Sequence, residues 1–194
     1  MPTTIRSAVV FCGSRPGRDP AWRDAGEALG RGMAAAGIRL IYGGGRTGLM
    51  GAVADGALAA GGAVTGIIPH FLQAREVAHV GVQDLIITDS MHSRKQLMSE
   101  HADAFVTLPG GLGTLDETVE IITWRQLGLH DKPILVANLN GWDDRLIGLL
   151  EGFVADDFAT EATRALYEIV PDVPTVLQRL TSLPASNQTD MTRL

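Results

Sequence analysis

The sequence predicts an α/β fold built on a parallel sheet of about six or seven strands, with helices on both faces. Short apolar runs alternate with longer amphipathic stretches from one end of the chain to the other. Strands and helices that follow one another in this way form parallel sheets. The apolar runs are continuous, as at residues 8–12, so the strands are expected to be buried on both faces. Together these observations indicate a Rossmann-like arrangement.

In the first half of the chain, strands and helices are expected to alternate in short units. Each strand is an apolar run that ends at glycine or proline. The strands are expected at residues 7–12, 39–42 and 63–68, and the helices at residues 21–36 and 49–60. Gly37, a residue type common just after helices, ends the first helix. A connection with little periodicity, residues 70–83, leads into the second half.

The second half continues the alternation to the end of the chain. Strands are expected at residues 84–88, 104–108, 133–138 and 165–170, with helices from about residue 91 and at residues 114–127, 142–153 and 173–183. Ser90 is expected to cap the first of these helices. In the helix at 114–127, Leu115, Val119 and Ile122 share one face, with Thr118 and Ile121 beside them.

Length and composition fit one globular domain over residues 1–194, with residues 184–194 as a frayed tail. Of the 194 residues, 45% are hydrophobic and 20% are charged, as in ordinary globular proteins. No apolar run approaches the roughly 20 residues that span a membrane, so no membrane partner is expected. The single cysteine, Cys12, agrees with a reducing compartment, and we expect a cytoplasmic protein.

The charge balance argues against nucleic acid as a partner. The chain has 16 basic and 22 acidic residues, a formal net charge of −6. A nucleic-acid binder needs a basic surface, and this chain has no overall excess of positive charge. Local basic residues remain available to bind a single phosphate.

In parallel sheets, ligands bind beyond the carboxyl ends of the strands, so the loops after the strands are the candidate sites. Four loops have this position, at residues 13–19, 43–48, 89–95 and 109–114. We include Ser14, from the first of them, among the candidate ligand-binding residues.

The loop at residues 43–48 satisfies G-x-G-x-x-G between a strand and a helix, as in dinucleotide-binding folds. Such folds also place an acidic residue about 20 residues later to hold the ribose. Here the next strand runs into Pro69 and His70 without a carboxylate, so no nicotinamide or flavin cofactor is expected. Two alternatives remain for these glycines. They allow close packing of strand and helix, or their N–H groups, that of Gly44 included, contact phosphate.

The loop at residues 109–117 reads P-G-G-L-G-T-L-D-E and is the most specific string in the chain. Three glycines between a strand and a helix leave N–H groups exposed at the positive end of the helix, where anions bind. Thr114 adds a hydroxyl donor. Thr114 and Glu117 also have the spacing of a capping box, in which both side chains bind the helix-end amides. Capping and catalysis therefore both remain open for Glu117.

P-G-G-x-G-T-x-x-E after a strand resembles the signature of the LONELY GUY family of cytokinin-activating phosphoribohydrolases, also described as possible lysine decarboxylases. Further strings match in order over about residues 7–155. They are F-C-G-S at 11–14, Y-G-G-G at 42–45, G-L-M-G at 48–51, G-I-I-P at 66–69, M-H-x-R-K at 91–95 and I-T-W at 122–124. The combination is far more specific than any one of these strings.

The resemblance implies hydrolysis of the N-glycosidic bond in N6-substituted adenosine 5′-monophosphates, with no metal and no organic cofactor. It implies that Arg94 and Glu117 are catalytic and that the protein is a homodimer. Substrate-binding positions expected with them are Ser14, Gly44, Glu76, Lys95, Gly110, Gly111, Leu112, Gly113, Thr114, Leu115, Asp116 and Thr123.

Three alternatives stay open at this point. The protein could be a broad AMP nucleosidase, or it could bind a nucleotide without cleaving it. A lysine decarboxylase would need pyridoxal phosphate on a Schiff-base lysine. The chain has only two lysines, Lys95 and Lys132, and the second directly precedes a strand, which speaks against this chemistry.

Overall fold

The computed structural model describes residues 4–73, 78–82 and 84–186, and within them the strands form one seven-stranded sheet. Its order is β4-β3-β2-β1-β5-β6-β7, and every neighbouring pair is parallel. The strands are β1 (Ser7–Phe11), β2 (Arg39–Tyr42), β3 (Val64–Pro69), β4 (Asp84–Thr88), β5 (Ala104–Thr107), β6 (Ile134–Ala137) and β7 (Glu168–Val170). The predicted fold class is confirmed.

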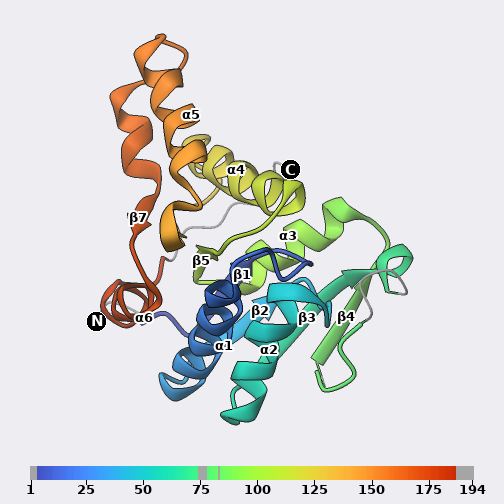
Figure 1. The fold of residues 1–194 in the computed structure, drawn as a ribbon. Coiled ribbons are helices and arrows are strands. Elements are labelled where there is room, and N and C mark those ends of the chain that lie inside the picture. The colour runs from blue at the N-terminus through green and yellow to red at the C-terminus, as the bar shows by residue number, and fades with distance from the viewer. Residues whose placement is uncertain (1–3, 74–77, 83, 187–194) are drawn as a thin grey trace.

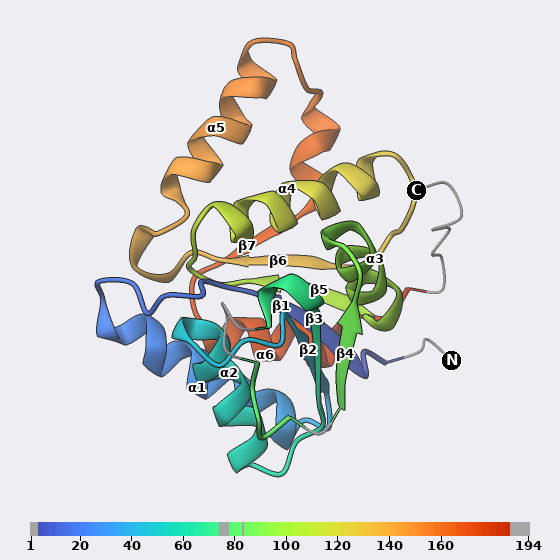
Figure 2. The ribbon, with the colours of Figure 1, turned by 90° about the vertical axis from the view of Figure 1, so that its right-hand side faces the viewer.

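Helices cover both faces of this sheet (Figure 1 and Figure 2). One face carries α1 (Pro20–Ala35), α2 (Gly48–Ala59) and α6 (Val173–Ser182), and the other carries α3 (Met91–His101) and α4 (Leu112–Gln126). Beyond α4, helix α5 (Asp144–Ala155) and the short 3-10 helix η3 (Glu161–Leu166) project away from the sheet. Two further 3-10 turns are η1 (His70–Leu72) and η2 (Leu139–Gly141). No helix among the described residues has both the length and the apolar character needed to cross a bilayer.

The two hydrophobic cores are built from alternate residues of the same strands. In β1, Ala8 and Val10 pack with α1, α2 and α6, whereas Val9 and Phe11 pack with α3 and α4. Because neighbouring residues of a strand point to opposite faces, a strand covered on both sides needs apolar residues at every position. This is the physical reason for the continuous apolar runs.

Strand order places a topological switch point between β1 and β5. From β1 the chain moves outward through β2, β3 and β4, and then returns to add β5 on the other side of β1. The helices that follow β1 and β5 therefore lie on opposite faces of the sheet, which leaves a crevice at the carboxyl ends of these strands.

Helix α4 differs from its prediction in two ways. It begins at Leu112 with Gly111 as the N-cap residue, and no side chain caps it. Thr114 therefore lies inside the first turn, and the capping-box interpretation of Thr114 and Glu117 is wrong. Leu115 and Val119 are exposed, while α4 buries Thr114, Thr118, Ile121, Ile122 and Trp124.

Smaller corrections concern the two ends of predicted elements. Strand β3 includes Pro69, one residue beyond its predicted end. The predicted strand at 165–170 is shorter, since η3 occupies its first residues. In the predicted tail, Pro184 forms an antiparallel bridge with Thr4, and residues 187–194 lie outside the described part of the chain.

The segment before β6 ties both α3 and α4 to the sheet. The buried His130 donates from Nε2 to the carbonyl of Ile121 at 2.9 Å, and its Nδ1 accepts from the N–H of Lys132 at 3.2 Å. Two residues on, Lys132 Nζ donates to the carbonyl of Ser99, in the last turn of α3, at 2.6 Å. The neutral ring of His130 thus uses both of its nitrogens in hydrogen bonds, one as donor and one as acceptor.

Acid should destabilise the protein through His130. Burial lowers its pKa from an ordinary value of 6.5 to about 4, so between these values the unfolded chain binds the proton more tightly. Stability from this group is complete above about pH 6.5 and is lost as the pH falls toward 4, by about 2–3 kcal/mol. Urea unfolding at pH 7.5 and 4.5 measures the loss. His130→Gln should be less stable at pH 7.5 but lose less on acidification, and an equal loss in both proteins would contradict this origin.

Candidate active site

A cleft of about 450 Å³ opens at the carboxyl ends of β1 and β5, where the switch point places it. Its floor and walls come from the loop after β1, the loop after β5, and the first turns of α3 and α4. The residues lining it are Cys12, Gly13, Ser14, Arg15, Pro16, Gly17, Trp22, Leu49, Met50, Leu72, Met91, Arg94, Pro109, Gly110, Gly111, Leu112, Gly113, Thr114, Asp116, Glu117 and Trp142.

One glycine of the β5 loop, Gly110, is required by a close approach of two backbones. Gly13 N–H donates to the carbonyl of Pro109 at 3.0 Å, which joins the β1 loop to the β5 loop. A Cβ on Gly110 would lie 2.0 Å from Thr114 Oγ1 and 2.9 Å from the nitrogen of Gly13. No side chain fits there. The first turn of α4 thus reaches the cleft with its N–H groups uncovered by any capping side chain, as an anion site requires.

Three buried threonines fix this first turn to the sheet. Thr118 Oγ1 donates to the carbonyl of Thr114 at 2.7 Å. Its remaining lone pairs accept from Thr107 Oγ1, on β5, at 2.9 Å. The positive end of α4 is therefore anchored to the strand that precedes it.

Arg94 is held by backbone carbonyls at the ends of two strands. Its Nε donates to Ile67 on β3 at 3.1 Å, and its Nη2 donates to Gly43, just after β2, at 3.0 Å. Only 4% of the residue is exposed, so Arg94 is a buried cation and not a surface arginine. A Cβ on Gly43 would lie 2.0 Å from Nη2, which explains the glycine at this position. The guanidinium lines the cleft in a fixed orientation.

Glu117 lines the same cleft from the second turn of α4 and is half-buried. Burial and then the negative charge of Glu117 raise the pKa of the Cys12 thiol, which lies at the end of β1. Cys12 is therefore a neutral thiol at physiological pH, and it cannot act there as a thiolate nucleophile. Beside this thiol, the cleft is lined by the carboxylate of Glu117 and the guanidinium of Arg94.

The structure brings most predicted site residues together. Beside Arg94 and Glu117, the cleft contains Ser14, Asp116 and residues 110–114. Four predicted binding residues are not among its lining residues: Gly44, Lys95, Leu115 and Thr123. Glu76 lies outside the described residues.

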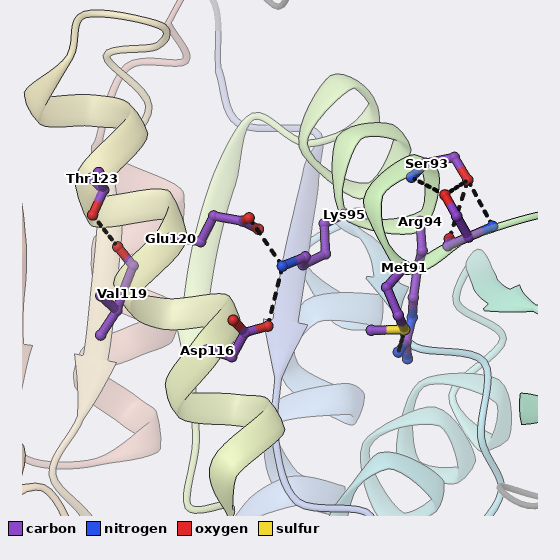
Figure 3. Close-up of polar contacts among 9 residues, drawn as sticks. Met91, Ser93, Arg94, Lys95, Asp116, Val119, Glu120 and Thr123 are labelled. Atoms are coloured by element: carbon purple, nitrogen blue, oxygen red, sulfur yellow. Dashed lines mark hydrogen bonds and ion pairs between the residues drawn. The ribbon is translucent and has the colours of Figure 1, made fainter. Parts of the chain in front are cut away.

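Gly44 and Thr123 contact other parts of the protein and do not line the cleft. Gly44 has a positive φ of 77°, and a Cβ there would lie 3.1 Å from Ile68 and 3.2 Å from Leu85. Close packing therefore accounts for the G-x-G-x-x-G loop. Thr123 is exposed on α4, and its Oγ1 donates to the carbonyl of Val119 at 2.8 Å (Figure 3).

Sequence reasoning missed the two tryptophans of the cleft. Trp142 follows β6, so the rule that ligands bind at carboxyl ends would have included its loop. Trp22 lies in the first turns of α1, where no motif marks it, and its Nε1 donates to the carbonyl of Leu139 at 3.4 Å. Gly17 packs against the indole, since a Cβ there would lie 2.5 Å from it. Both rings add apolar surface for a flat ligand.

Taken together, the fold and the cleft define an α/β enzyme with a fixed guanidinium, a carboxylate and an anion-binding helix end. Residues 50–180 match the family described as "Possible lysine decarboxylase". A cytokinin riboside 5′-monophosphate phosphoribohydrolase of Rhodococcoides fascians is 43% identical over 88% of this chain and 86% of its own. A probable enzyme of the same name from Oryza sativa subsp. japonica is 43% identical over 91% of this chain and 78% of its own. The chain belongs to this family, the LONELY GUY phosphoribohydrolases, which are N-glycosyl hydrolases.

The fold alone is shared more widely. The molybdenum cofactor carrier protein of Chlamydomonas reinhardtii superposes with a TM-score of 0.68 at 20% identity, covering 91% of this chain and 98% of its own.

Gly43→Ala should destabilise the protein, because the new methyl group displaces the buried Arg94 guanidinium from its two carbonyls. We expect a loss of about 1–3 kcal/mol in the free energy of unfolding, measured in urea. Gly148, inside α5, has open space around its Cβ position and serves as the control. Gly148→Ala should be neutral or stabilising by up to about 1 kcal/mol. Equal stability of the two variants would contradict the role of Gly43.

Proposed function

We propose that this protein hydrolyses the N-glycosidic bond of N6-substituted adenosine 5′-monophosphates, releasing the free base and ribose 5-phosphate. The observation that carries the proposal is that Arg94 and Glu117 line one cleft with the glycine-rich loop and the start of α4. The names of the relatives from Rhodococcoides fascians and Oryza sativa support this substrate class.

The chemistry of ribosyl transfer explains a carboxylate at this place. Breaking a ribosyl C–N bond passes through an oxocarbenium-like state, with positive charge on the sugar. The carboxylate of Glu117 stabilises that charge and orients the attacking water. Glu117 does not cap α4, so the capping alternative no longer competes with this role.

The departing base needs a positive charge near it. As the C–N bond breaks, negative charge accumulates on the adenine, and a guanidinium opposes it through directed hydrogen bonds. Two of the Arg94 nitrogens are engaged by Ile67 and Gly43, which fixes the plane of the group before substrate arrives. A preorganised cation costs little reorganisation in the transition state.

The 5′-phosphate of the substrate is the third group for which the cleft offers a binding site. The first-turn N–H groups of α4 and the hydroxyl of Thr114 form the anion site, with Ser14 across the cleft on the β1 loop. The flat indoles of Trp22 and Trp142 leave apolar surface for the base. No metal or organic cofactor enters this reaction.

The decarboxylase alternative lacks a suitable lysine. Lys95 Nζ is bound to Asp116 and Glu120, and Lys132 is buried beside the last turn of α3. Neither lysine lines the cleft. A Schiff base would need one of them there.

We propose further that the protein is a homodimer that acts in the cytoplasm, where nucleoside monophosphates are found. Helix α4 exposes a row of apolar side chains, Leu112, Leu115 and Val119, and Leu112 is 85% exposed. Apolar side chains gathered on one helix face are typical of protein contacts, and a second copy of the chain would cover them.

The 5′-phosphate should be required for efficient turnover. Charge-assisted hydrogen bonds are worth about 1.5–3 kcal/mol each, and binding at the phosphate also positions the ribose. We expect kcat/KM for nucleosides to be at least about 100-fold below that for their monophosphates. Base release from AMP, isopentenyl-AMP and the matching nucleosides measures this. Nucleosides cleaved as fast as monophosphates would contradict the phosphate site, and equal rates for AMP and isopentenyl-AMP would favour a broad nucleosidase.

Glu117→Gln should fold normally and be nearly inactive. The amide neither stabilises an oxocarbenium ion nor activates water, so we expect base release to fall by about 100-fold or more, or about 3 kcal/mol in the barrier. Thermal midpoint and base release are measured together. Glu100→Gln, on the exposed side of α3, is the control and should keep the wild-type rate. A stable Glu117→Gln protein within about threefold of wild type would refute the catalytic role.

A further inference from the structure

Lys95 was expected to bind substrate, but its side chain is directed elsewhere. From α3 it reaches across to α4, where Nζ donates to Asp116 Oδ2 at 3.1 Å and to Glu120 Oε1 at 2.9 Å (Figure 3). Consecutive helix residues point about 100° apart, so Arg94 can enter the cleft while Lys95 faces the neighbouring helix.

Both ends of this contact adjoin a residue of the proposed mechanism. Lys95 directly follows Arg94 on α3, and Asp116 directly precedes Glu117 on α4. Glu120 lies one turn beyond Glu117, on a neighbouring part of the helix surface. The Lys95 contact thus joins the two turns that carry the guanidinium and the carboxylate.

The Glu120 half of the contact is partly shielded from water and is therefore stronger than an ordinary surface pair. The side chains of Lys95 and Glu120 are 15% and 26% exposed, against 59% for Asp116. Burial lowers the pKa of Lys95, but the hydrogen bonds to Glu120 and Asp116 outweigh it and raise the pKa above its ordinary value. The ammonium therefore stays charged at physiological pH.

Glu120 depends on this cation. Among the residues that the structure describes, its Oε2 is buried without a hydrogen-bond partner, and the contact with Lys95 balances the charge of the carboxylate. Removing one partner of a buried pair leaves an uncompensated charge, which the structure can relieve only by moving apart or admitting water. Either change shifts α4 relative to α3.

Resting on the proposed function, we infer that Lys95 is a positioning residue: its contact with Asp116 and Glu120 sets the separation of Arg94 and Glu117 across the bound nucleotide. A displacement of about 1 Å in a catalytic group can cost about 100-fold in rate. The first turn of α4 stays anchored to β5 through Thr107 and Thr118, so the contact acts more on the second turn, which carries Glu117, than on the phosphate site.

Lys95→Met tests this by removing the ammonium while keeping most of the apolar stem. We expect kcat for base release from isopentenyl-AMP to fall at least tenfold, with KM within about threefold of wild type. The double variant Lys95→Met, Glu120→Leu removes the stranded charge and restores packing between the helices, since apolar replacement of a buried pair is often neutral or stabilising. Its kcat should return to within about threefold of wild type.

The double variant also separates positioning from direct binding. If the ammonium contacts the substrate, the double variant stays as slow as Lys95→Met and KM rises in both, which would overturn the inference. Arg179→Met is the matched control, because Arg179 and Glu168 form an ion pair at 2.8 Å between α6 and β7 with side chains 36% and 40% exposed. It should lose stability without any change in kcat.

Amide hydrogen exchange gives a readout that needs no turnover. Protection of α3 and of the second turn of α4 should decrease in Lys95→Met and return in the double variant. Wild-type protection and wild-type kcat in Lys95→Met would overturn the inference. If the wild-type protein releases no base from any monophosphate, the proposed function fails, and the exchange data still decide whether Lys95 holds the two helices.

Discussion

The site depends on one buried positive charge, the guanidinium of Arg94. A buried cation is tolerated only when polar groups surround it, and here the carbonyls of Gly43 and Ile67 at the ends of two adjacent strands supply them. This requirement accounts for the missing side chain at Gly43. The two hydrogen bonds of Arg94 also fix α3 over the sheet, because Arg94 lies in the first turn of α3. The rest of the cleft is arranged around that fixed point.

Much of this could be predicted from the sequence, because the governing signals are local. Continuous apolar runs and the glycines after them place all seven strands within a few residues of where they lie. The start of α4 was predicted two residues late, since Thr114 resembles an N-cap residue and Gly111 offers no side chain to recognise. Resemblance located Arg94 and Glu117, whereas spacing alone left capping and catalysis equally open for Glu117.

The features that the sequence did not predict depend on contacts between residues far apart in the chain. Nothing local distinguishes a glycine that binds phosphate from one that packs against Ile68, as Gly44 does. Likewise, no motif indicates whether Lys95 points into the cleft or toward the carboxylate of Glu120, 25 residues later. The two tryptophans of the cleft, Trp22 and Trp142, are far apart in the sequence and are brought together by the order of the strands.

Strand order also has a consequence for synthesis on the ribosome. Residues 4–88 contain β1 to β4, and until β5 emerges, β1 has a partner on one side only. The strand that becomes the centre of the sheet is therefore first an unprotected, strongly apolar edge, a surface that pairs readily with other chains. Residues 104–107 close that edge and, in the same step, bring the β5 loop against the β1 loop. Protection of the nascent chain and the joining of these two loops of the cleft are thus one event.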